Sequence, residues 1–368
     1  MKFLILSTAT GQGHNSAAAA LKESLEQLDC EAVVKDVLKS GKTKASDRVS
    51  SLYTNMTLHF PHFFGLLYHA GEVVSSSRRH SPIYYLNTLY EGSLLRQINT
   101  LHPDCIVCTH IFSAQAVTRL YEKHRINIPT AGIITDYTCS PFWEETRLDS
   151  YIIPVEALTD EFVKKGIPEE KLVPLGIPVR KCFYEAIPKK QARMLLHLNC
   201  DRLFVIAGGS MGYGHIRKLA LTLSGQMPDA QTVVLCGYNE KLYRELEGIK
   251  NIMPYRYTDK ISVFMDAADV LLTKPGGLTS SEALVKNVPM VLTGPIPGGE
   301  ERNAAFLSSL GVAVSAREAN TAAREAERLM VNPYAVQKML EKQKQHFGCL
   351  KRGLLAEYLV DMVKARLG

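Results

Sequence analysis

The sequence predicts an α/β protein of two domains, each with a parallel sheet, which face each other across a cleft. The main observation is a repeat: an apolar run leads into a glycine turn and then a helix at residues 3–21, and again at residues 203–221. Short β-rich runs alternate with helical periods along the whole chain, which favours parallel strands covered by helices. The 368 residues suffice for two such domains, each with its own core.

Strands are expected where a short apolar run, rich in β-branched residues, is bounded by polar residues, glycine or proline. These runs are 2–7, 31–37, 104–109, 130–135 and 150–154 in the first half, and 203–207, 231–236, 251–254, 269–273, 289–292 and 312–314 in the second. The stretch 174–178, with two prolines and a glycine, is typical of a linker. From Pro333 to the end we expect amphipathic helix rich in Lys and Arg.

The composition is that of an ordinary globular protein, with 46% hydrophobic and 22% charged residues. The net charge of +6 is not gathered in a dense basic stripe, so we expect anionic small molecules or anionic lipids as partners and no nucleic acid. No apolar stretch is long enough to span a membrane and no secretory segment is apparent, which predicts a cytoplasmic protein. The eight cysteines are scattered, and Cys105-x-x-Cys108 lies in an apolar run that predicts a buried strand, not a metal site.

The first glycine turn, Gly11-Gln12-Gly13-His14, opens a helix directly after a strand. A helix N-terminus has free backbone N–H groups and a partial positive charge, which suits phosphate. Gly11-x-Gly13 followed by Asp36 is also part of a dinucleotide fingerprint, so an NAD-dependent oxidoreductase is an alternative. A plain glycine turn with a surface His14 is a further alternative.

The second glycine turn carries four glycines between residues 208 and 214. Residues without a Cβ let the backbone approach a ligand closely and adopt positive φ angles. This turn therefore favours contact with a diphosphate over a purely structural role.

A buried strand near residues 269–273 ends in Lys274-Pro275-Gly276-Gly277, and we expect a helix to begin with Thr279, three residues before Glu282. The two oxygens of Glu282 could accept both hydroxyls of a ribose. Thr279-x-x-Glu282 also fits a capping box, in which Glu282 would bond only to its own helix end. The spacing does not separate these two interpretations.

The turn 294–304 follows the next strand and carries Glu300 and Asn303, side chains suited to sugar hydroxyls. An acidic helix N-terminus favoured by the macrodipole is the alternative. Asp136, after the run 130–135, is a candidate base or else a turn cap. The aromatic segment 53–68 with the basic residues 78–80 suits either a membrane interface or the core of the first domain.

Six motifs together resemble the monogalactosyldiacylglycerol synthase and processive diacylglycerol glucosyltransferase family. They are residues 11–17, 135–136, 176–179, 208–212, 273–283 and 297–303. The resemblance covers nearly the whole chain and extends more distantly to the GlcNAc transferase that makes lipid II. It implies a GT-B fold of two Rossmann-like domains, with a lipid-acceptor domain over 1–178 and a UDP-sugar domain over 179–350. A final helix over 351–368 would cross back to the first domain.

The resemblance also implies roles for individual residues. It places Gly209, Ser210 and Met211 at the diphosphate, Glu282 at the ribose, Arg256, Tyr257 and Phe264 near the uracil, and Glu300 and Asn303 at the donor sugar. Gly13, Lys274, Gly276, Gly277 and Thr279 complete the expected substrate contacts. Asp136 and His14 are the implied catalytic residues, with Asp136 the leading candidate for the base and His14 helping at the diphosphate or acceptor side.

The implied reaction is an inverting transfer of a hexose from a UDP-sugar to a membrane lipid, first of all 1,2-diacylglycerol, on the inner face of the cell membrane. Lys274 and helix N-termini could stabilise the departing UDP, so we expect neither a metal nor a cofactor. Gly299 stands where relatives commonly have Gln, and residues 137–140 lack the His that plant relatives have before the proline at 141, so the donor sugar and the exact acceptor stay open. A transferase that uses UDP-GlcNAc and a non-catalytic UDP-sugar sensor are the alternatives.

Overall fold

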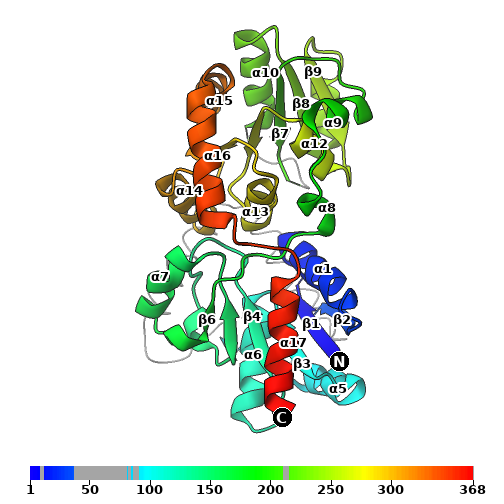
Figure 1. Ribbon diagram of the computed structural model, residues 1–368, viewed down its shortest axis with the longest axis vertical. Helices are drawn as coiled ribbons and strands as arrows, with labels where there is room; N and C mark the ends of the chain where they lie inside the picture. The colour runs from blue at the N-terminus through cyan, green and yellow to red at the C-terminus, as the bar shows by residue number, and fades with distance from the viewer. Residues whose placement is uncertain (9–11, 37–80, 82–83, 86–90, 210–214, 368) are drawn as a thin grey trace. The chain divides into compact units, whose positions relative to one another are not determined.

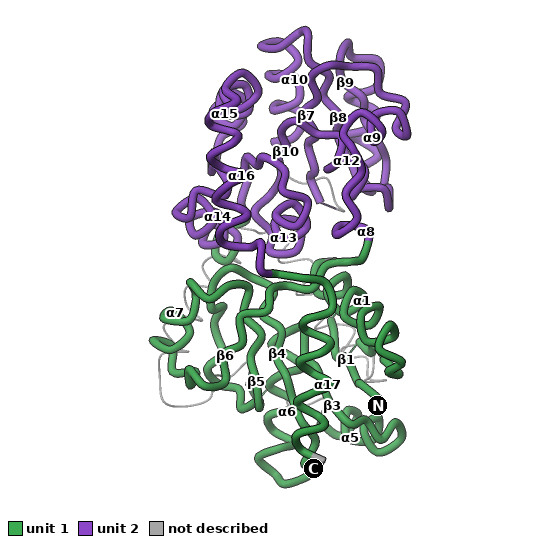
Figure 2. Tube along the Cα trace, viewed as in Figure 1, with its two compact units in different colours: residues 1–181, 296–299, 350–368 green, residues 182–295, 300–349 purple. Residues whose placement is uncertain are grey.

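The computed structural model describes residues 1–8, 12–36, 81, 84–85, 91–209 and 215–367. Within them the chain forms two compact units, each around its own sheet (Figure 2). Unit 1 comprises residues 1–181, 296–299 and 350–368, and unit 2 comprises residues 182–295 and 300–349. The change from one unit to the other after Lys181 lies three residues beyond the expected boundary at 178.

Unit 1 contains a six-stranded parallel sheet of order β2-β1-β3-β4-β5-β6 (Figure 1). The strands are β1 (Lys2–Ser7), β2 (Glu31–Asp36), β3 (Cys105–Cys108), β4 (Thr130–Ile133), β5 (Ser150–Ile152) and β6 (Leu172–Val173). The helices are α1 (Gln12–Glu26), α5 (Glu91–Leu101), α6 (Ile111–Glu122), α7 (Thr159–Lys164) and α17 (Leu354–Leu367), with short 3-10 turns at Trp143–Glu145, Glu156–Leu158 and Glu169–Lys171.

The core of unit 1 forms because the central strands are apolar on both faces. Every residue of β3 and β4 is buried, including Cys105 and Cys108, which confirms the prediction of a core strand for that cysteine pair. Burial raises the pKa of the Cys108 thiol to about 12. Helix α17 places Leu355 and Leu359 in the same core as residues of α1, so the last helix is part of unit 1.

Unit 2 repeats the arrangement with a six-stranded parallel sheet of order β12-β11-β10-β7-β8-β9. The strands are β7 (Leu203–Ala207), β8 (Gln231–Gly237), β9 (Ile252–Arg256), β10 (Val270–Thr273), β11 (Met290–Leu292) and β12 (Val314–Ser315). The helices are α8 (Lys181–Tyr184), α9 (Lys189–Leu195), α10 (Ile216–Gln226), α11 (Glu240–Leu246), α12 (Ile261–Ala267), α13 (Gly277–Lys286), α14 (Gly299–Ser309), α15 (Ala319–Val331) and α16 (Pro333–Phe347).

The core of unit 2 lies under α10 and α15, which pack side by side on one face of the sheet. Alanines of α15, among them Ala322 and Ala326, are fully buried and let the helix approach closely. The stretch from Pro333, expected to be helical, forms two helices, α16 and α17, and α17 falls within the final helix expected over 351–368. The chain turns between them, where Gly353 has φ +90°. In the part of the chain that is described, every helix is too short or too polar to cross a membrane.

Candidate active site

Each sheet has one place where the strand order reverses direction. In unit 1 it lies between β1 and β3, and in unit 2 between β7 and β10. Ligands of open parallel sheets bind beyond the carboxyl ends of the strands at such a point. The glycine turn before α1 follows β1, the glycine turn at 208–209 follows β7, and the Lys274–Gly277 turn follows β10. The topology therefore brings the predicted motifs of each unit to the ligand-binding edge of its sheet.

His14 lies in the first turn of α1, next to Gly13, and its ring is fixed from two neighbouring strand ends. Its Nδ1 atom is 2.9 Å from the backbone oxygen of Thr109 and 3.0 Å from the hydroxyl oxygen of Thr135. A carbonyl oxygen only accepts hydrogen bonds, so Nδ1 carries the proton of the neutral ring. The Nε2 atom of His14 then keeps a lone pair, which suits it to accept a proton.

Burial keeps this imidazole neutral at pH 7. Desolvation lowers the pKa of His14, and the nearby charge of Asp136 and the hydrogen bond to Thr109 oppose that shift without cancelling it. The ring of His110 packs edge-on against His14, with 4.6 Å between the ring centroids. Desolvation and the neighbouring His14 hold the pKa of His110 well below 6.5. His110 Nδ1 accepts the backbone N–H of Phe112 and so caps α6.

The buried His110 predicts a pH-dependent stability. Because its pKa is lowered in the folded state, the unfolded chain binds more protons, and the free energy of unfolding falls as the pH drops below about 6.5. His110→Asn keeps a cap for the Phe112 N–H but does not titrate. We expect the variant to lose less stability on acidification, by up to about 1.4 kcal/mol per pH unit, in urea unfolding measured at pH 7.5 and pH 5.5.

The exposed His124 supplies the control, because His124→Asn makes the same substitution at the surface of the same unit. Its pH dependence should match that of the wild type. A His110→Asn protein that loses as much stability as the wild type between the two pH values would contradict the assignment.

Asp136 follows β4 and is partly exposed, whereas the next three residues of the chain are buried. The hydroxyl of Ser140 donates a 3.2 Å hydrogen bond to its Oδ2. The next helical turn along the chain begins at Trp143 with Phe142 as its N-cap, so Asp136 does not cap that turn. His14 bonds to Thr135, the residue before Asp136, and its pKa responds to the Asp136 charge. Unit 1 thus holds both predicted catalytic residues within electrostatic reach of each other.

In unit 2 the glycine turn after β7 is described only as far as Gly209, which has φ +72° and open space around the position of a Cβ. The predicted contacts Ser210 and Met211 lie outside the described residues, as do Gly11 and the predicted acceptor segments 53–68 and 78–80. Gly209 has the left-handed backbone that the sequence analysis expected of this turn.

The structure excludes Thr279 as the first residue of a capping box with Glu282. Helix α13 begins at Gly277, two residues before the predicted start at Thr279, and its N-cap is Gly276, which has no side chain. Thr279 and Glu282 therefore both lie inside the helix, and Thr279 is not the N-cap that a capping box requires. The Glu282 side chain is buried, with 5% of its residue surface exposed.

Lys274 and Glu300 meet beside this helix start, with 3.5 Å between Lys274 Nζ and Glu300 Oε1. A Cβ on Gly276 would lie 4.0 Å from the same carboxylate oxygen, so the backbone at this turn is close to Glu300. Asn303 is fully buried, and its amide donates a 3.0 Å hydrogen bond to the backbone oxygen of Pro275. Asn303 thereby holds the Lys274–Gly277 turn in place.

The residues predicted near uracil lie in different environments. Phe264 is 1% exposed and packs edge-on against Tyr255, so it is a core residue of α12. Tyr257 is exposed and stacks on Tyr238, with ring centroids 4.7 Å apart. Arg256 is held by two hydrogen bonds to Glu240, of 2.8 and 2.9 Å, and lies over the ring of Tyr243. Arg256 and Tyr257 therefore form an ordered surface at the end of β9. Phe264 is not part of that surface, because it is buried in the core.

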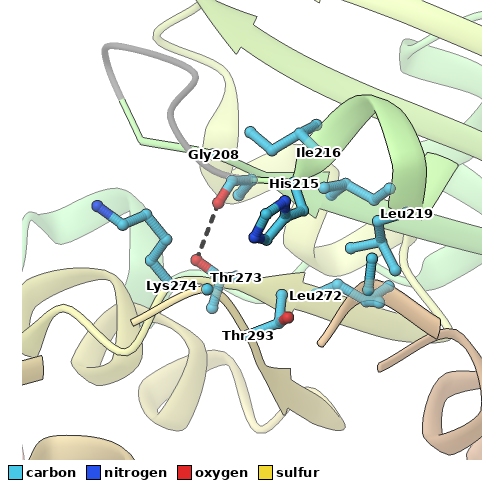
Figure 3. A pocket seen from close by; sticks show the side chains of 12 residues that line it. Gly208, His215, Ile216, Leu219, Leu272, Thr273, Lys274 and Thr293 are labelled. Atoms are coloured by element: carbon cyan, nitrogen blue, oxygen red, sulfur yellow. Dashed lines mark hydrogen bonds between the residues drawn. The ribbon is translucent and has the colours of Figure 1, made fainter. Parts of the chain in front are cut away.

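A small pocket opens between the strand ends and α10 (Figure 3). Gly208, His215, Thr273, Lys274 and Thr293 are among its lining residues, and the Thr273 hydroxyl donates to the backbone oxygen of Ala207. Its volume of about 20 Å³ has room for about one water molecule. The pocket is too small for a nucleotide, and it contains the Thr273–Ala207 hydrogen bond that joins β10 to β7.

Comparison with known proteins matches each half of the chain to a family. Residues 14–179 match the monogalactosyldiacylglycerol (MGDG) synthase family, and residues 203–347 match the glycosyltransferase family 28 C-terminal domain. The chain is 27% identical over 372 aligned positions to a processive diacylglycerol beta-glucosyltransferase of Bacillus cereus (strain AH820), covering 99% of this chain and 93% of the relative. A Bacillus thuringiensis (strain Al Hakam) protein of the same name is 27% identical and is covered to 93%.

Solved structures show the same fold at low sequence identity. MurG of Acinetobacter baumannii superposes with a TM-score of 0.62 at 14% identity over 99% of both chains. UDP-GlcNAc 2-epimerase from Neisseria meningitidis superposes with a TM-score of 0.62 at 15% identity, over 99% of this chain and 100% of that chain. Since a transferase and an epimerase share this fold, the reaction is assigned from the families and not from the fold. The chain is therefore a GT-B glycosyltransferase whose first half carries the monogalactosyldiacylglycerol synthase domain and whose second half carries the glycosyltransferase family 28 C-terminal domain.

Proposed function

We propose that this enzyme transfers a hexose from a UDP-sugar to 1,2-diacylglycerol and forms a β-glycosyl diacylglycerol with inversion. The observation that carries the proposal is the full-length match to proteins named processive diacylglycerol beta-glucosyltransferases, because it spans the acceptor-type and the donor-type halves together. The chemistry of the two sheet edges supports it. Unit 1 supplies groups that accept a proton, and unit 2 supplies glycine turns and a cation.

In the proposed reaction the acceptor hydroxyl oxygen attacks the anomeric carbon of the sugar. The bond from that carbon to the β-phosphate oxygen breaks, and its electron pair leaves with UDP. The hydroxyl proton passes to a base in unit 1, for which Asp136 is the leading candidate and His14 Nε2 the alternative. Attack from the face opposite the leaving group converts an α-linked donor into a β-glycoside.

Unit 2 would stabilise the departing UDP. We assign the diphosphate to the N–H groups of the Gly209 turn and to Lys274, and the ribose to Glu282. Glu300, which holds Lys274 through an ion pair, is assigned to the donor sugar. Asn303 acts in this scheme by holding the turn through Pro275. These contacts account for charge stabilisation without a metal ion.

We further propose that the enzyme works at the inner face of the cell membrane as a peripheral protein that is attracted by anionic lipids. The proposed acceptor requires contact with a membrane surface, because diacylglycerol stays in the bilayer. The net charge of +6 favours an anionic surface.

Incubation of the purified enzyme with liposomes tests the proposal. The liposomes contain diacylglycerol, with or without an anionic lipid, and each of UDP-glucose, UDP-galactose and UDP-GlcNAc is added in turn. Mass spectrometry of the lipids should show a hexose on diacylglycerol with at least one donor, and the number of added sugars gives the processivity. If no UDP-sugar is consumed and no glycosylated lipid forms with any donor, the proposal is contradicted and a UDP-sugar sensor is favoured.

A further inference from the structure

The segment that follows Asp136 in unit 1 is anchored by a glutamate from another element. Glu161 lies on α7, and its Oε1 atom accepts the Thr138 hydroxyl at 2.6 Å and the Cys139 backbone N–H at 2.7 Å. Thr138 and Cys139 are buried. Hydrogen bonds to an ionised carboxylate are shorter and stronger than neutral ones. The two bonds therefore fix the segment 136–142, which we call the base loop, to α7.

The fixed part of the base loop is connected to Asp136 itself. Ser140 directly follows the two anchored residues, and its hydroxyl donates to Asp136 Oδ2 at 3.2 Å. Glu161 thus holds the backbone that places the Ser140 hydroxyl, and Ser140 holds the Asp136 carboxylate. None of these contacts lies within a single helix or strand. They therefore fix the conformation of the loop.

A second glutamate, Glu145, anchors the helical turn that directly follows the base loop. Glu145 is buried and accepts the Ser81 N–H at 3.0 Å, the Ser81 hydroxyl at 3.0 Å and the Gln115 side-chain amide at 2.9 Å. Between the two anchors Phe142 has φ +77°, a left-handed backbone that is strained for a bulky residue. Such strain persists only where the surroundings determine the backbone. The base loop is therefore held in one conformation at a cost, which is typical of a functional segment.

We propose that Glu161 is a positioning residue for the transfer reaction: it holds the base loop so that the Asp136 carboxylate points at the acceptor hydroxyl. The inference rests on the proposed role of Asp136. Glu161 touches neither substrate nor reacting atoms in this scheme. Its loss should lower kcat and leave the KM for the UDP-sugar unchanged, because the donor is assigned to unit 2.

The first test compares three variants in the liposome assay. Glu161→Leu removes both hydrogen bonds, Glu161→Gln keeps an acceptor oxygen of the same shape, and Glu170→Gln changes an exposed glutamate of the same unit. We expect kcat to fall about 10-fold or more in Glu161→Leu, since a small misplacement of a reacting group is costly. Glu161→Gln should restore most of the loss, and Glu170→Gln should equal the wild type. Wild-type kcat in Glu161→Leu would overturn the proposal.

A double-mutant cycle separates positioning from general stability. If Glu161 acts through Asp136, Glu161→Leu has no further effect on the residual transfer of an Asp136→Asn protein. An equal fold-loss in both backgrounds would overturn the proposal. Should Glu161→Leu fail to fold, Thr138→Val removes one of the two bonds and enters the same cycle. If Asp136→Asn alone keeps full turnover, the proposed base is wrong. If Asp136→Asn is impaired but Glu161→Leu is not, only the positioning role fails.

Discussion

Asp136→Asn should lower hexosyl transfer by ~100-fold or more while the binding of UDP is retained. The substitution keeps the size of the side chain and an oxygen that can accept the Ser140 hydroxyl. It removes the negative charge that takes the proton from the acceptor hydroxyl. Because UDP is assigned to unit 2, its dissociation constant should change little. The measurements are initial rates of lipid glycosylation and calorimetric titration of UDP on the same preparation.

The control is Asp160→Asn, at an exposed position on α7 in the same unit, which should keep wild-type rates. Parallel measurement of His14→Ala distinguishes the two candidate bases. Near-wild-type turnover in Asp136→Asn, with severe loss in His14→Ala, would transfer the role of base to His14 Nε2. Because Nδ1 carries the proton that is shared with the Thr109 oxygen, Nε2 has the lone pair that can accept a proton.

Glu282→Ala should weaken the binding of UDP by about 10- to 100-fold, because hydrogen bonds to a charged group contribute about 1.5–3 kcal/mol. The expected loss assumes that the carboxylate accepts the ribose hydroxyls. Glu282 is buried in α13, five residues after the first residue of the helix, so the unfolding temperature of the variant is measured alongside. Titration of UDP and of 2′,3′-dideoxy-UDP measures the effect.

Glu282→Gln serves as the matched variant, since it fills the same volume and keeps one acceptor oxygen. It should lose less affinity than Glu282→Ala. The dideoxy nucleotide should bind equally well to the wild type and both variants. Equal weakening of the binding of UDP and dideoxy-UDP would show that Glu282 does not contact the ribose hydroxyls. If the unfolding temperature of the variant is also lowered, the loss of affinity is explained by damage to α13.

Much of the fold could be predicted from the sequence because parallel strands are apolar on both faces. Strands β1 and β7 have the predicted bounds, and nine others differ at their ends by one or two residues. β6 was not predicted because its two residues, Leu172 and Val173, give no periodic pattern. The stretch from Pro333 to the end is helical as predicted, and α17 falls within the final helix expected over residues 351–368.

The site residues could be predicted from the sequence only where polar side chains directly follow a strand. Lys274 and Glu300 come from consecutive loops at one sheet edge, so the topology alone brings them together. The Thr109 oxygen that fixes the His14 ring is 95 residues away, and a backbone atom has no sequence signature. Glu161 likewise acts 22 and 23 residues from its partners, and nothing in its sequence context distinguishes it from a surface glutamate. Burial of Phe264 and Asn303 depends on packing that motifs do not report.

The central claim is that unit 2 binds uridine diphosphate through the turn at Gly209, Lys274 and Glu282, with the uracil at the surface formed by Arg256 and Tyr257. Calorimetric titration of UDP into the full-length enzyme tests it most directly, with ADP as the matched nucleotide. The account predicts saturable heat for one UDP per chain, much weaker binding of ADP, and a loss of affinity in Glu282→Ala. No heat with UDP, or equal binding of UDP and ADP, would contradict it.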